Sequence, residues 1–193
     1  MELLGKKVGF AMCGSFCTFK KALIALEALV ERGADVYPIM SETSFSTDTR
    51  FGDSVYFQEE VKKICKKEII KTVKEAEPIG PKELLDLLIV LPCTGNSLAK
   101  IAHGITDTSV TMAVKAHLRN QRPVLIGVST NDGLGAAAKN IGSLLNSKNI
   151  YFIPLAQDDC KHKPRSLVAD FEKVIPASMA ALDHKQLQPI LVV

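Results

Sequence analysis

The sequence lacks any uninterrupted apolar run that approaches about 18 residues, and it therefore predicts no membrane-spanning helix. Its first residues already carry charges at Glu2, Lys6 and Lys7 and lead directly into an apolar run, unlike a secretory signal peptide. A net charge of +3 is too small to indicate nucleic-acid binding, and it favours at most a mildly anionic ligand. These absences predict a cytoplasmic protein.

The cysteines are few, odd in number and widely separated, and no two of them form a Cys-x-x-Cys pair. Such spacing is typical of neither a disulfide framework nor a zinc site, so we expect no bound metal. The five cysteines are Cys13, Cys17, Cys65, Cys93 and Cys160.

Apolar runs and amphipathic stretches alternate along the 193 residues, with no internal repeat and no change of composition that would mark a second domain. This pattern predicts one α/β domain over residues 1–193, a three-layer α/β/α sandwich with a parallel, flavodoxin/Rossmann-like sheet. Strands are expected at residues 7–12, 35–40, 87–91, 123–128 and 150–153. Helices are expected at residues 19–32, 58–72, 108–118, 133–145 and 166–182, with a loop at 41–54 and a tail at 186–193 docked on its own domain or on a neighbouring protomer.

The first strand leads into Gly14-Ser15-Phe16-Cys17-Thr18. Such a loop either binds a phosphate through its N–H groups and hydroxyls or is an ordinary turn capped by Ser or Thr. The chain contains neither Gly-x-Gly-x-x-Gly nor Gly-x-x-x-x-Gly-Lys-Ser/Thr, and without the first motif Glu42 is a weak candidate for a ribose-binding acid. A dinucleotide is therefore disfavoured, whereas a mononucleotide phosphate stays open.

Polar side chains also follow the third and fourth predicted strands. Thr94, Asn96 and Ser97 stand between the third strand and a helix-compatible stretch, where open α/β sheets bind ligands. The neighbouring Cys93 is better explained as a small buried side chain than as a nucleophile. After the fourth strand, hydroxyl and amide groups that can bind a planar ring edge or a carboxylate occur at Ser129, Thr130 and Asn131, and the following Asp132 suits a helix N-cap.

A segment after the fifth strand concentrates cations beside Asp158 and Asp159. It is either an exposed charged loop or a loop that closes over a carboxylate-bearing substrate, with Arg165 able to bind one carboxylate through two hydrogen bonds. The candidate substrate-binding residues are Lys161, His162 and Arg165.

The segment Pro92-Cys93-Thr94-Gly95-Asn96-Ser97 resembles the Pro-Ala-Ser-Ala-Asn-Thr signature of homo-oligomeric flavin-containing cysteine decarboxylases and the Pro-Cys-Ser segment of flavin prenyltransferases. The resemblance implies bound FMN at an interface between protomers, commonly of a trimer, with residues 94–105 at that interface. It implies a phosphate site at Gly14, Ser15, Ser41 and Thr43, and flavin contacts at Thr94, Asn96 and Ser97.

The sequence departs from those relatives at residues that they use, so neither cysteine decarboxylation nor prenyl transfer is expected of this chain. Residues 77–81 contain no histidine where the decarboxylases have one, and Ser129-Thr130-Asn131-Asp132 replaces their Pro-x-Met-Asn motif. Met112 and Ser129-Thr130 stand where the prenyltransferases have an Arg and an Arg-Glu pair. Over residues 8–182 the chain most resembles the B subunits of dipicolinate synthases.

That resemblance implies the oxidation of dihydrodipicolinate, a dicarboxylate, to dipicolinate in the mother cell of a sporulating bacterium, together with an A subunit. The hydride acceptor is either FMN on this chain or NAD(P) on the partner, and no residue stands out as a catalytic base. Two alternatives stay open, namely a non-catalytic subunit that supports the A subunit and a flavin-dependent decarboxylase.

Overall fold

Five parallel strands form the centre of the sheet in the computed structural model, which describes residues 2–192. Their spatial order is β2-β1-β3-β4-β5, which is the flavodoxin-like order. A short antiparallel hairpin, β6–β7, extends the sheet, because β7 pairs with the end of β4 at Ser129 and Thr130. The strands are β1 (Lys7–Met12), β2 (Asp35–Met40), β3 (Leu87–Cys93), β4 (Val124–Thr130), β5 (Ile150–Phe152), β6 (Leu155–Ala156) and β7 (Leu167–Ala169).

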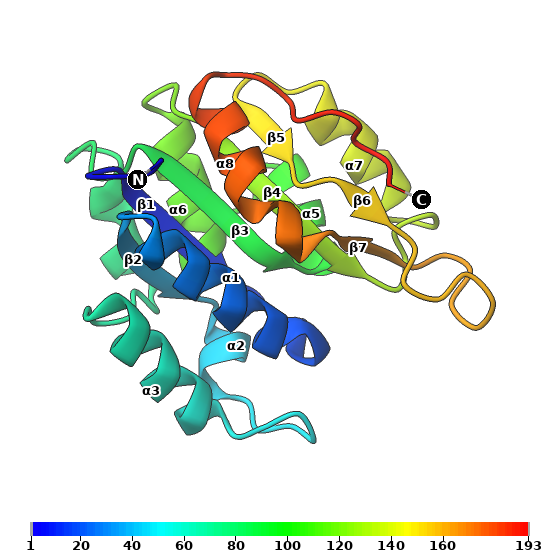
Figure 1. Ribbon diagram of the computed structural model, residues 1–193, viewed down its shortest axis with the longest axis horizontal. Coiled ribbons are helices and arrows are strands. Elements are labelled where there is room, and N and C mark those ends of the chain that lie inside the picture. Colours follow the sequence, from blue (N-terminus) through cyan, green and yellow to red (C-terminus); the bar gives the residue numbers. More distant parts are fainter. Residues whose placement is uncertain (1, 193) are drawn as a thin grey trace.

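Helices cover both faces of this sheet (Figure 1). Every residue of β3 is buried, as expected for a parallel strand between two helical layers. One core contains Phe10, Phe19 and Leu26, and the other contains Val90 and Val110. The helices are α1 (Phe19–Glu31), α2 (Glu42–Ser46), α3 (Ser54–Cys65), α4 (Val73–Ala76), α5 (Gly95–Ala102), α6 (Ser109–Leu118), α7 (Ala138–Leu145) and α8 (Val174–Leu182), with 3-10 turns η1 (Phe16–Thr18), η2 (Glu77–Ile79) and η3 (Phe171–Lys173).

The predicted fold class is confirmed, but the bounds of several elements are wrong. The expected loop at 41–54 contains α2, whose N-cap is Ser41. The helix expected at 58–72 ends at Cys65, because Lys66 adopts a left-handed conformation with φ 53°. The helix expected at 133–145 begins only at Ala138.

The largest error concerns residues 166–182. Residues 167–169 form β7, and α8 starts only at Val174. Backbone pairing of Val168 with Ser129 draws this segment into the sheet, and that pairing depends on residues far away in the sequence.

The C-terminal tail docks on its own domain. The backbone N–H of Leu155 donates to the carbonyl of Ile190 at 2.7 Å, and that of Val192 donates to the carbonyl of Leu155 at 2.9 Å. The side chain of Gln186 bonds to both backbone groups of Phe152. Within residues 2–192, none of the helices has the length and apolar composition needed to cross a bilayer.

Candidate functional site

The carboxyl ends of β1 and β3 lie side by side at the point where the strand order reverses. From β1 the chain crosses to β2 on one side, and it returns to β3 on the other side. In open α/β sheets, ligands bind in the crevice outside such a switch point. The loops that follow β1, β2, β3 and β4 therefore define the candidate site.

Gly14 and Thr43 bring the ends of β1 and β2 together. A methyl group on Gly14 would stand 3.3 Å from Cγ2 of Thr43, so the two residues are direct neighbours. Ser41 contributes less than predicted, since its buried hydroxyl accepts the N–H of Ser44 at 3.2 Å as the cap of α2. Thr43 is exposed beside it and carries the accessible hydroxyl.

The loop after β1 reaches across the end of β3. Oγ of Ser15 lies 2.8 Å from Oγ of Ser129 on β4, although β3 separates these two strands. The N–H groups of Gly14, Phe16 and Cys17 have no hydrogen-bond acceptor within residues 2–192. Unpaired N–H groups beside hydroxyls form the donor set that an anionic phosphate needs.

The N-terminus of α5 forms the next wall of the site. Thr94 is its N-cap, and its Oγ1 accepts the N–H of Ser97 at 3.2 Å. A methyl group on Gly95 would stand only 2.9 Å from Oγ1 of Thr130, so a residue without a side chain lets α5 approach the end of β4. Asn96 points outward and is exposed, as is Asn131 after β4.

Two buried thiols lie beneath this wall. Cys13 and Cys93 are 1% and 0% exposed at the ends of adjacent strands. A hydrogen bond with the Cys93 thiol lowers the pKa of Cys13, although burial alone would raise it. Hydrogen bonds from Ser97 and from the backbone N–H of Thr94 lower this pKa further. The same contact, together with burial, raises the pKa of Cys93 well above its usual range. A nucleophilic role for Cys93 is therefore disfavoured.

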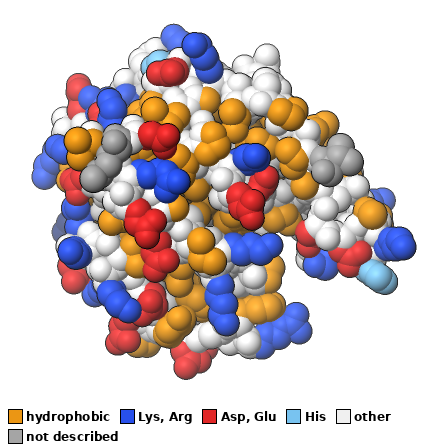
Figure 2. Space-filling view, viewed as in Figure 1, with side chains coloured by type: hydrophobic (Ala, Val, Ile, Leu, Met, Phe, Trp, Pro, Cys, Tyr) orange, Lys and Arg blue, Asp and Glu red, His pale blue; other side chains and the backbone are white. Residues whose placement is uncertain are grey.

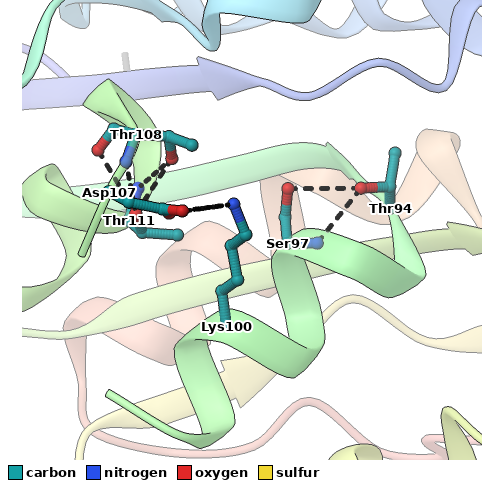
Figure 3. A network of polar contacts seen from close by, with 6 residues as sticks. All are labelled: Thr94, Ser97, Lys100, Asp107, Thr108 and Thr111. Atoms are coloured by element: carbon teal, nitrogen blue, oxygen red, sulfur yellow. Dashed lines mark hydrogen bonds and ion pairs between the residues drawn. The ribbon is translucent and has the colours of Figure 1, made fainter. Parts of the chain in front are cut away.

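A polar network that we did not predict joins α5 to the start of α6 (Figure 3). Nζ of Lys100 lies 2.8 Å from Oδ2 of Asp107, and this contact lowers the pKa of Asp107. Thr108 caps α6 and exchanges hydrogen bonds with Thr111. His103, the other residue near Asp107 in sequence, instead bonds to the carbonyl of Ala99. The Ser/Thr-x-x-Thr spacing before an apolar stretch was the available sequence signal for this cap.

The loop at 157–166 joins β6 to β7 and protrudes beside a hollow (Figure 2). Asp159 binds His162 at 3.1 Å, so this predicted substrate ligand already has a partner within its own loop. A hydrogen bond from the hydroxyl of Ser166 lowers the pKa of Asp158, and the ammonium group of Lys163 lowers it further.

Two cations of this loop remain unpaired: Lys161 and Arg165 are exposed and form no ion pair within residues 2–192. The Arg165 side chain runs past Gly135, close to the end of β4.

The structure thus groups the predicted residues into two sets. Around the switch point it brings together Gly14, Ser15, Ser41, Thr43, Thr94, Ser97, Ser129 and Thr130, with Asn96 and Asn131 exposed at the rim. The predicted cations occupy the separate hairpin loop. Hydroxyls, free N–H groups and glycines at the strand ends fit a mononucleotide such as FMN. Within the described residues there is no cluster of metal-binding side chains.

Comparisons with known proteins identify the family of this chain. A family model described as "Flavoprotein" matches residues 1–177. The chain is 44% identical over 191 residues to the B subunit of dipicolinate synthase from Bacillus subtilis (strain 168), an alignment that covers 99% of this chain and 96% of that protein.

Solved structures give the same result. The crystal structure of the dipicolinate synthase B subunit from Bacillus halodurans C superposes with a TM-score of 0.92 at 46% identity, over 100% of this chain and 99% of that chain. The FMN-dependent cysteine decarboxylase SpaF has a TM-score of 0.66 at 19% identity, over 93% and 98% of the two chains, and so shares the fold. The chain therefore belongs to the flavoprotein family, and within it to the dipicolinate synthase B subunits.

Proposed function

We propose that this chain is the FMN-binding B subunit of a cytoplasmic dipicolinate synthase, which oxidises dihydrodipicolinate to dipicolinate together with an A subunit during sporulation. The observation that carries the proposal is the convergence of hydroxyls and free N–H groups at the β1–β3 switch point. The 44% identity to a protein named as such a subunit supports the choice of reaction.

In this proposal the chain's own residues bind and orient the ligands. The N–H groups of the loop after β1, with Ser15 and Thr43, hold the phosphate. Thr94, Asn96 and Ser97 at the start of α5 and Ser129, Thr130 and Asn131 after β4 contact the ring system. Aromatisation of dihydrodipicolinate removes two electrons and two protons, and a flavin supplies an electron acceptor for such a step. The alternative electron acceptor that we propose is NAD(P) bound to the A subunit.

Reconstitution tests the reaction directly. Purified A subunit is mixed with this chain and FMN, and the conversion of dihydrodipicolinate to dipicolinate is measured. We expect turnover only when both chains are present. Equal turnover in the absence of this chain would contradict a catalytic role for it.

The hairpin loop at 157–166 is proposed to bind a substrate carboxylate through Arg165, with Lys161 and His162 beside it. We expect Arg165→Ala to lower turnover of the reconstituted enzyme at least tenfold, because losing a desolvated charge-assisted contact costs ~2–5 kcal/mol and a tenfold change needs only about 1.4 kcal/mol. Flavin content should stay unchanged. Lys82→Ala, which removes an exposed cation elsewhere, is the matched control. Unchanged kinetics in Arg165→Ala would show that the loop is only a solvated segment.

A supporting, non-catalytic subunit is the second candidate. The departures from the catalytic relatives favour it, because residues 77–81 contain no histidine and Ser129-Thr130 stands where the prenyltransferases have an Arg-Glu pair. On either candidate we propose a homo-oligomer, with residues 94–105 at one interface. A structural neighbour of 16% identity is described as a dodecameric FMN-dependent decarboxylase, which accords with such an assembly.

A further inference from the structure

A pocket of about 300 Å³ lies between α5 and α7, which pack side by side. From α5 it is lined by Gly95, Ala99 and His103, which lie four positions apart and so share one face of that helix. This face differs from the one that carries the polar network of Figure 3. The other wall comes from the loop after β4 and from α7, and it consists of Asp132, Ala136, Ala137, Lys139 and Asn140.

The side chain of Asn140 points to a ligand in this pocket. Asn140 is only 6% exposed, and its amide has no hydrogen-bond partner within residues 2–192. Folded proteins nearly always pair a buried amide with protein, water or ligand, because an unpaired one costs free energy. Since Asn140 lines the pocket, the missing partner has room to stand there.

The pocket also carries two opposite charges that no protein group neutralises. Within residues 2–192, neither Lys139 nor Asp132 has an oppositely charged group at ion-pair distance. Oδ1 of Asp132 accepts the N–H of Ala136 at 3.0 Å, which fixes the carboxylate in place. Nδ1 of His103 lies 2.8 Å from the carbonyl of Ala99, so Nδ1 carries the proton and Nε2 of the neutral ring is an acceptor.

We propose that this pocket binds a small zwitterion, namely a free α-amino acid. In this assignment Lys139 pairs with the carboxylate of the ligand and Asp132 with its ammonium group. The buried amide of Asn140 bonds to the ligand between them, because an amide both donates and accepts. The small residues Gly95 and Ala99 leave room for the side chain of the ligand. The site requires neither flavin nor the proposed oxidation, so it stands apart from the proposed function.

A binding screen on the purified full chain tests the class of ligand. Each of the standard L-amino acids is added in excess, and the melting temperature is measured. We expect at least one to raise it, because a ligand that binds only the folded state stabilises that state. In calorimetric titrations, the amine and the carboxylic acid with the same side chain should each bind at least tenfold more weakly than that amino acid, a difference of about 1.4 kcal/mol or more.

Variants of the pocket test the assigned contacts in the same titrations. Asn140→Leu removes the amide at similar volume, and Lys139→Gln removes the cation, so each should weaken binding at least tenfold. Lys115→Gln removes an exposed cation on α6 and is the matched control, with wild-type affinity expected. Ala136→Leu fills the pocket from its exposed side and should also abolish binding, which keeps the test valid if Asn140→Leu does not fold.

Three results would overturn the proposal. The first is that no amino acid binds saturably, as happens if water or a side chain of a neighbouring protomer fills the pocket. The second is wild-type affinity in both Asn140→Leu and Ala136→Leu. The third is displacement of the amino acid by FMN, which would make the pocket part of the flavin site. Flavin binding is measured on the same wild-type sample, so failure of this site and failure of the proposed function are observed separately.

Discussion

Replacing Ser15 with aspartate is expected to abolish FMN binding. The substitution puts a carboxylate beside the free N–H groups of the loop after β1, where we place the phosphate. Like charges brought into contact cost several kcal/mol, and a 100-fold loss of affinity needs only about 2.7 kcal/mol. The variant should therefore retain no flavin after gel filtration.

Flavin retention measured by absorbance checks this expectation, with two control variants. Ser143→Asp adds the same charge on the exposed surface of α7 and should retain flavin like the wild-type protein. Ser15→Ala removes the hydrogen bond to Ser129 without adding charge and should weaken binding less than aspartate does. Wild-type affinity in Ser15→Asp would refute the assignment of this loop to the phosphate.

Stability should fall on acidification because of His117, a fully buried residue of α6. Nε2 of its ring lies 3.0 Å from the carbonyl of Pro123, and Nδ1 has no hydrogen-bond partner within residues 2–192. Burial lowers the pKa of His117 from 6.5 to about 4. The unfolded chain therefore takes up a proton between these two values while the folded chain does not, and stability is lost as the pH falls through that window.

The expected size follows from the same two pKa values. The free energy of unfolding should drop by about 2 kcal/mol between pH 7.5 and pH 5, and by about 3 kcal/mol in total below pH 4. Urea unfolding of the wild-type protein and of His117→Gln at both pH values measures the share of this loss that is due to His117. Glutamine keeps a donor for the Pro123 carbonyl but does not titrate. A loss of equal size in the variant would show that His117 is not responsible.

The sequence predicted the parallel core well because each buried strand is a continuous apolar run. Residues 7–12 and 35–40 coincide with β1 and β2. β7 was missed, because a three-residue strand at Leu167–Ala169 owes its conformation to pairing with the end of β4. Local periodicity does not contain that information.

The sequence indicated which residues occupy the candidate site, but it did not indicate which of their side chains contact one another. Ser41 was predicted to bind phosphate, yet it caps α2, and the two roles favour the same side chains. The proximity of Ser15 to Ser129 and of Cys13 to Cys93 depends on the strand order, which periodicity does not specify. The ion pair between Lys100 and Asp107 was not predicted either, because it joins α5 to the loop that follows it.

The visible absorbance of the purified protein, together with mass spectrometry of the released ligand, tests flavin binding most directly. The protein is incubated with excess FMN and passed through gel filtration before both measurements. We expect flavin absorbance in the protein fraction and FMN as the released ligand, near one molecule per chain. A colourless protein that releases no flavin would contradict the proposed function.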